Sequence, residues 1–155
     1  MIEITGDKEL DAKLLALGQK EARKVAASAI RKGMTVISKA IKAEVKATFK
    51  SKTGNLHNGI GARLKRISNP ENVTAKVGVG VGPAKAMAKK LAGAAFHLHL
   101  LALGTQERQT KAGHPTGKVQ PNDFVDRGFA KSESAAKDKI IDSLRQGIEK
   151  AATKK

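Results

Sequence analysis

The segment from Gln19 to Thr48, QKEARKVAASAIRKGMTVISKAIKAEVKAT, has the strongest periodic pattern in this chain of 155 residues. At 100° per residue its apolar side chains fall on one broad arc, and the opposite arc is basic: Lys20, Lys24, Arg31, Lys39, Lys42 and Lys46. This separation predicts one amphipathic helix over residues 19–48. Such a helix spans roughly 45 Å, more than the width of a compact domain of this size. Either it breaks near Gly33, or one end projects onto a neighbour, or Gly33 permits close helix packing.

A second long helix is predicted at the end of the chain, from Asp123 or Phe124 to about Ala152. Its apolar side chains recur at helical spacing and form one stripe: Phe129, Ala136, Ile140, Leu144 and Ile148. Each of the two predicted helices therefore has one apolar face that must be buried against another element.

The middle of the chain has the period of two that is typical of β-strands. Residues 61–67 alternate, and valine or alanine alternates with small or polar residues from Val73 to Gly82. The turn sequence Ser-Asn-Pro-Glu-Asn at 68–72 joins them, which predicts an antiparallel hairpin. We also expect a strand over about residues 95–103, because Phe96, Leu98 and Leu100 alternate with other residues up to Gly104. Shorter elements are predicted before and after the hairpin: a strand at 2–4 and helices at 7–17 and 84–91.

The predicted fold class is α+β, with two long helices packed on a small antiparallel β-sheet. Residues 105–122 are polar, contain two glycines and two prolines, and have Val119 as their one large aliphatic side chain. Loops of this length inside a small domain are usually functional or ordered by a partner, so we expect a long flexible loop before the C-terminal helix. Residues 1–152 are expected to form one domain, followed by a mobile basic tail at 153–155.

The composition predicts a thin hydrophobic core. Leu, Ile, Val and Phe make up only 35 of the 155 residues, and much of the remaining apolar content is alanine. This fraction lies just above the level at which disorder becomes the expected state. Because a bound partner stabilises the folded form by mass action, we expect neighbouring subunits to supply part of the stability.

Several kinds of functional site find little support in the sequence. The chain has no cysteine, which excludes disulfides and thiolate chemistry. His97 and His99 would share one side of a strand, but a metal site needs three or four ligands, so a structural role is favoured. The glycine-rich run 78–82 lacks the remaining signals of a nucleotide-binding loop. We expect no enzyme activity, no cofactor and no metal, and the apolar run 91–103 is too short to span a membrane.

Charge is the remaining feature, since 30 basic residues face 14 acidic ones and the formal net charge is +16. A basic helix face is usually just solvated, but a field of this size would also attract polyanions without reading their sequence. The side chains expected to face DNA or an acidic partner come from the first long helix, the segment just after it and the hairpin: Lys39, Lys42, Lys46, Lys50, Arg63, Lys65 and Arg66.

The order of several short motifs resembles a tailed-bacteriophage family of tail-completion, head–tail joining or minor tail proteins. The resemblance begins with the opening Ile2–Gly18 and continues with Lys-Thr-Gly-Asn-Leu at 52–56. Leu-Gly-Thr at 103–105 ends the strand that is expected before the loop, and Pro-Asn-Asp-Phe-Val at 121–125 introduces the last helix. The chain departs from the family in the strand before Gly-Thr, where His97, Leu100 and Ala102 replace two aromatic residues and a glutamate.

The resemblance implies a structural virion protein of a long-tailed phage, made in the host bacterial cytoplasm. It implies a homo-oligomeric ring in the neck, which we expect to be a hexamer, between the head connector or stopper and the tail terminator or tail tube. Packaged double-stranded DNA in the ring lumen is a further candidate partner, and no membrane is involved. We expect subunit or partner contacts at Phe96, His97, His99, Leu103, Gly104, Thr105, Arg108, Lys111, Phe124 and Phe129.

The alternative is a free, basic, nucleic-acid-binding protein of the architectural kind. The positive charge favours it. The absence of a recognisable helix-turn-helix or zinc finger counts against it, and so does the lack of aromatic residues on which bases could stack.

Overall fold

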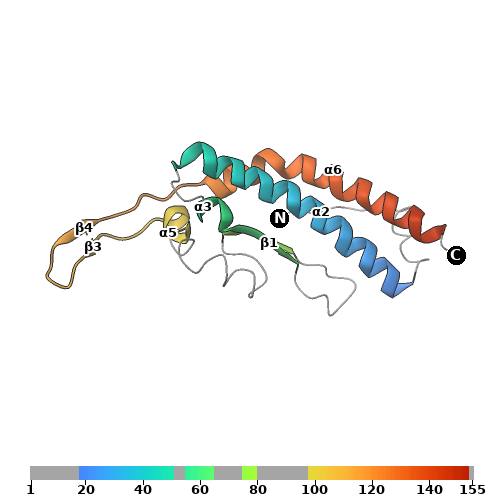
Figure 1. The fold of residues 1–155 in the computed structure, drawn as a ribbon, viewed down its shortest axis with the longest axis horizontal. Helices are drawn as coiled ribbons and strands as arrows, with labels where there is room; N and C mark the ends of the chain where they lie inside the picture. Colours follow the sequence, from blue (N-terminus) through green and yellow to red (C-terminus); the bar gives the residue numbers. More distant parts are fainter. Residues whose placement is uncertain (1–17, 51–54, 65–74, 80–97, 154–155) are drawn as a thin grey trace.

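The body of the protein is a pair of long antiparallel helices that lie side by side (Figure 1). The computed structural model describes residues 18–50, 55–64, 75–79 and 98–153. Helix α2 covers Gln19–Thr48 and helix α6 covers Phe124–Ala152. Both predicted long helices are confirmed with these limits.

Small residues let α2 and α6 approach closely, and α2 passes Gly33 without a break. A β-carbon on Gly33 would lie 2.4 Å from Cγ1 of Ile140, and one on Gly128 would lie 2.7 Å from Cα of Ile41. A β-carbon on Gly147 would likewise lie 2.6 Å from Cγ1 of Val25. Glycine inside a helix costs roughly 0.5–1 kcal/mol relative to alanine, so close packing has to offset this cost. The third of the alternatives for Gly33, close helix packing, is therefore confirmed.

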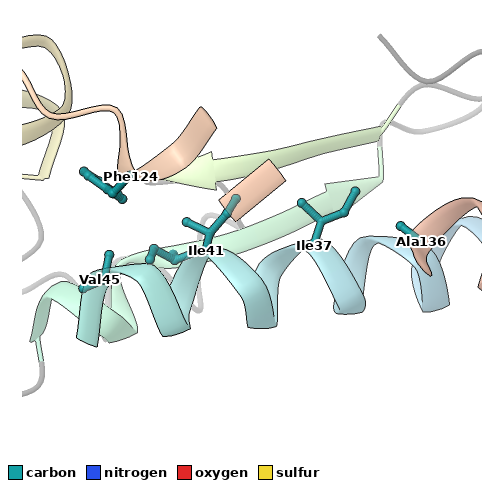
Figure 2. Close-up of a cluster of buried hydrophobic side chains, with 6 residues drawn as sticks. Ile37, Ile41, Val45, Phe124 and Ala136 are labelled. Carbon is teal, nitrogen blue, oxygen red and sulfur yellow. The ribbon is translucent and has the colours of Figure 1, made fainter. Parts of the chain in front are cut away.

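The hydrophobic core lies along the face that α2 turns toward α6 and the sheet. Figure 2 shows Ile37, Ile41 and Val45 projecting from one side of α2, with Phe124 at the start of α6 nearby. Phe124 has no exposed surface, and its ring contacts Phe49 edge-on at a centroid distance of 5.6 Å. The buried face of α6 combines three large residues with four small ones: Phe124, Gly128, Ser132, Ala136, Ile140, Ser143 and Ile148. Phe129 and Leu144, which the predicted stripe included, are only half-buried.

After α2, the short helix α3 (Asn55–Asn58) leads into a two-stranded antiparallel sheet. Strand β1 (Ile60–Leu64) pairs with β2 (Ala75–Val79) in a register that runs from Ile60 opposite Val79 to Leu64 opposite Ala75. Ile60 is buried and Val77 packs against the core cluster, so the sheet packs on α2. The predicted antiparallel pair is confirmed, while the outer parts of both predicted strands lie outside the described residues.

The predicted strand over residues 95–103 is wrong for the part that the structure describes. Leu98–Leu103 form a short helix, α5. Its sequence, Leu-His-Leu-Leu-Ala-Leu, is a brief apolar run, and periodicity alone does not separate a buried helix from a strand in such runs. Leucine and alanine are strong helix formers, and Leu101 and Ala102 pack against the core cluster.

The polar segment after α5 forms a hairpin in place of the expected flexible loop. Strand β3 (Arg108–Gln109) pairs antiparallel with β4 (Pro115–Gly117), with a register shift between the two pairs. The fold class, α+β with two long helices and a small antiparallel sheet, is confirmed. The elements predicted at 2–4, 7–17 and 84–91 and the last residues of the tail lie outside the described residues.

Candidate assembly surfaces

Residues 104–121 form an arm that extends away from the helical body (Figure 1). Every residue from 106 to 118 is exposed, and Gly104, Thr105 and Val119 near the base are partly covered. Strands β3 and β4 are too short to bury a face of their own, because an isolated two-stranded hairpin is marginal in water. The arm therefore offers its whole surface for contact with another molecule.

Backbone hydrogen bonds fix the base of the arm to the body. The Thr105 amide donates to the Val119 carbonyl at 2.9 Å, and the Val119 amide donates to Thr105 Oγ1 at 2.9 Å. The Asn122 amide donates to the Leu101 carbonyl of α5 at 3.0 Å. Gly104 has φ +74°, and a β-carbon there would meet the Val119 carbonyl oxygen at 2.9 Å. The direction in which the arm leaves the body is therefore set by local geometry.

The tip of the arm is closed by a turn around Gly113. The Thr110 amide donates to the His114 carbonyl, and the Gly113 amide donates to the Thr110 carbonyl, both at 2.9 Å. Thr110 Oγ1 also accepts from the His114 amide at 3.1 Å. Gly113 has φ +80°, a conformation that favours glycine. These bonds explain why a segment without hydrophobic periodicity still forms a defined hairpin.

A polar cluster joins α2 to α6 at the end of the body from which the arm leaves. Glu44 accepts from Lys131 Nζ at 2.6 Å and from Arg127 Nε at 3.3 Å. Arg127 also pairs with Asp123 and donates to the Asn122 side-chain oxygen at 3.1 Å. The hydrogen bond from Lys131 is the main cause that lowers the pKa of Glu44 below its ordinary value of 4.5, although partial burial acts in the opposite direction. The cluster thus ties Asn122 and Asp123, which connect the arm to α6, to both long helices.

The Glu44 cluster was missed by the sequence analysis, although one signal was present. Glu44 is one of two acidic residues within 12–52, and it falls beside the apolar arc of its helix, close to Ile37 and Ile41 in angle. A charged residue in that position needs a partner from the facing helix, and Arg127 and Lys131 supply it.

The basic residues that the sequence singled out are largely exposed. Lys39, Lys46 and Lys50 are exposed and Lys42 is half-buried. Within the described ranges, none of these four side chains has an ion pair. Arg63 of β1 is exposed directly opposite Lys76 of β2, so two like charges face each other across the sheet. Lys65 and Arg66 lie outside the described residues.

The structure brings six of the predicted contact residues together at the arm or its base. Leu103 is 80% exposed where α5 meets the arm, and the other five are His99, Gly104, Thr105, Arg108 and Lys111. Phe124 is a core residue with no exposed surface and is therefore corrected from contact candidate to core. Phe129 is half-buried and packs against the core cluster. Phe96 and His97 lie outside the described residues, and a helical Leu98–Leu103 removes the basis for placing His97 and His99 on one side of a strand.

At the other end of the body, an open groove of about 840 Å³ lies along the contact between the beginning of α2 and the end of α6. Its lining is mixed and includes Lys24, Lys32, Gln146 and Glu149. In the part of the chain that the structure describes, no three His, Cys, Asp or Glu side chains are grouped so that they could hold a metal ion. None of the described helices has a stretch apolar and long enough to cross a lipid bilayer.

Comparison with known proteins identifies the family. Residues 8–99, more than half of the chain, match the model of the HK97-gp10-like family, which is described as "Bacteriophage HK97-gp10, putative tail-component". The matched region includes α2 and the β1–β2 sheet and ends before the arm and α6. No curated protein and no solved structure matches the chain. The resemblance to a phage tail family that the sequence motifs indicated is therefore confirmed, and the chain belongs to the HK97-gp10-like family of bacteriophage tail components.

Proposed function

We propose that this tail component is a ring-forming neck protein that joins the head connector to the tail tube. The observation that carries the proposal is the arm, which has 13 consecutive exposed residues, 106–118, and a base fixed to the body. An ordered hairpin without intramolecular packing gains most of its contacts from a neighbour. A subunit of a closed assembly needs such contacts with its neighbours, so an exposed and ordered arm supports this role.

A ring of identical subunits needs two different surfaces on each subunit, because a head-to-tail interface joins unlike patches. The arm together with the adjoining helix α5 supplies one of them, and we assign to this surface the contact residues His99, Leu103, Gly104, Thr105, Arg108 and Lys111. The second surface is on the body of the next copy. We propose a hexamer as the closed state, located in the virion neck, with the head connector or stopper on one side and the tail terminator or tail tube on the other.

The charge of the arm makes its contacts testable. Arg108, Lys111 and Lys118 outnumber Glu107, so the arm is positive along its exposed length. The double variant Arg108→Glu with Lys111→Glu reverses two charges at the surface proposed for assembly. The matched control, Lys139→Glu with Lys150→Glu, makes the same change of charge at two exposed residues of α6.

The role is tested by deleting the gene from the phage and supplying each variant in trans. Without the protein, we expect DNA-filled heads and separate tails by negative-stain electron microscopy, with joined particles restored by the wild-type chain and the α6 control. The arm variant should leave heads and tails separate. Normal joined particles in the deletion would exclude the neck role, and full rescue by the arm variant would exclude the arm as the contact.

A further inference from the structure

One face of α2 has a row of basic side chains that the fold itself does not use. Arg31, Lys39, Lys42 and Lys46 are spaced by eight, three and four residues, which places them on one side of the helix. They are exposed, except for the half-buried Lys42. This row, which we call the α2 basic stripe, is about 22 Å long at 1.5 Å per residue. Ile37, Ile41 and Val45 enter the core from a different face of the helix.

The stripe costs the isolated subunit free energy. Like charges three or four residues apart destabilise a helix by roughly 0.2–0.5 kcal/mol per pair, and Lys39, Lys42 and Lys46 form two such pairs in a row. No acidic side chain of the described residues pairs with the stripe. Of the two acids in α2, Glu44 is held by α6 and Glu21 pairs with Lys24. Among the described residues, therefore, no anion neutralises the stripe, and an anion supplied by another molecule can bind there.

Solubility does not account for this surplus of charge. Helix α6 has nearly the same length as α2, 29 against 30 residues. Six basic and five acidic side chains cover α6, whereas α2 has eight basic and two acidic ones. Both helices bury one face and expose the other, so a balanced mixture of charges is sufficient to solvate a helix of this kind. The stripe is thus a specific property of α2.

The residue types of the stripe favour DNA over an acidic protein as the polyanion that binds there. Lysine is depleted and arginine enriched at protein–protein interfaces, while lysine remains a common phosphate ligand that acts as a point charge and needs no fixed geometry. Three of the four stripe residues are lysine. The chain has no Trp and no Tyr, and single-strand binders stack bases on such rings. We propose that the α2 basic stripe is a contact surface for the phosphate backbone of double-stranded DNA.

Salt dependence provides the quantitative expectation. Each neutralised phosphate contributes about −0.9 to the slope of log affinity against log salt, so four contacts give about −3.6. Affinity should then fall about 150-fold between roughly 50 and 200 mM salt. Replacing Lys39, Lys42 and Lys46 by glutamine removes three charges, keeps good helix formers, and should reduce the slope by about 2.7.

The experiment measures fluorescence anisotropy of a labelled duplex of about 30 base pairs, of arbitrary sequence, over that salt range. Wild type is compared with Lys39→Gln/Lys42→Gln/Lys46→Gln and with Lys137→Gln/Lys139→Gln/Lys150→Gln, which removes the same charge from α6. We expect the slope to fall only in the α2 variant, with circular dichroism unchanged in both.

Equal slopes in the two variants, or no change from wild type, would overturn the proposal, because net charge alone would then explain the binding. Poly-L-glutamate is the second probe. If it binds through the stripe while the duplex does not, an acidic protein is the partner and the assignment to DNA is wrong. The arm is intact in all these variants, so the result does not depend on the assembly role proposed above.

Discussion

The helical body and the arm are built in opposite ways. In the body, Phe124, Ile41 and Val45 are almost completely buried, and glycines let the two long helices touch at their backbones. In the arm, residues 106–118 are all exposed, and hydrogen bonds of the backbone and of two threonine hydroxyls define the turn and the base. The body is therefore stabilised by its own packing, while the arm is shaped by the chain but gains its contacts elsewhere. Substitutions of the same kind should have different consequences in the two regions.

The largest difference is expected for apolar side chains. Phe124→Ala leaves a cavity beside Phe49 in the core, and we expect a loss of about 3–5 kcal/mol in the free energy of unfolding. Leu103→Ala, at the exposed base of the arm, should change it by less than about 0.5 kcal/mol. Urea denaturation followed by circular dichroism measures the free energy of unfolding of both variants. Similar losses in the two would show that packing in the body is not the main source of stability.

A glycine substitution makes the same comparison at the level of the backbone. In Gly128→Ala the new β-carbon meets the backbone of Ile41. We expect the steric overlap to destabilise the folded state by about 1–3 kcal/mol. This cost exceeds the roughly 1 kcal/mol by which alanine is favoured over glycine inside a helix. Gly113→Ala strains a turn at the tip, where φ is +80° and nothing lies within 4 Å, so it should leave the midpoint of global unfolding unchanged. A more stable Gly128→Ala variant would show that the helices do not pack as closely as described.

Acid should weaken the junction between the two regions through Glu44. Because its pKa is lowered in the folded state, Glu44 contributes stability above the ordinary value of 4.5 that is lost as the pH falls through the folded pKa. Glu44→Gln should be less stable than wild type at pH 7, and the difference should shrink in acid. The control is Glu133→Gln, whose partner Lys137 is on the same helix at 3.1 Å. Equal pH profiles for wild type and Glu44→Gln would contradict the role of the cluster.

The smallest effect is expected at the sheet. Lys76→Glu converts the like-charge pair with Arg63 into an opposite-charge pair across the β1–β2 ladder. Cross-strand pairs contribute roughly 0.2–1 kcal/mol, so a slight increase in melting temperature is expected. Lys111→Glu makes the same charge change at the tip of the arm, where thermal unfolding should not respond. A drop in the melting temperature of Lys76→Glu would indicate that other charges dominate around Arg63.

The two regions also differ in how far they could be predicted from the sequence. The limits of α2 and α6 followed from helical periodicity, because both helices bury one face along their whole length. The β1–β2 pair followed from alternation. The arm could not be predicted in this way, since it buries no side chains and its paired strands have only two and three residues. Its shape depends on hydrogen bonds and on glycines at positive φ, such as Gly113 and Gly117.

Errors in the candidate surfaces have equally local reasons. Phe124 was expected at a contact because it is an apolar residue of the terminal helix, yet its ring fills the core beside Phe49. Helix α5 was taken for a strand because six apolar or histidine residues in a row fit either structure. The Glu44 cluster depends on a contact between residues more than 80 positions apart, which periodicity within one helix does not reveal. The exposure of Lys39 and Lys46 could be predicted because charge separation follows the same helical period as the core.

The most direct test of the account replaces residues 106–118 by a short Gly-Ser linker and measures two properties of the same variant. We expect an unchanged free energy of unfolding in urea, together with loss of joined particles when this variant is supplied in place of the deleted gene. A fall in stability would show that the arm belongs to the folding unit. Unchanged stability with full rescue would show that no neighbour needs the arm, and either result would contradict the division between body and arm.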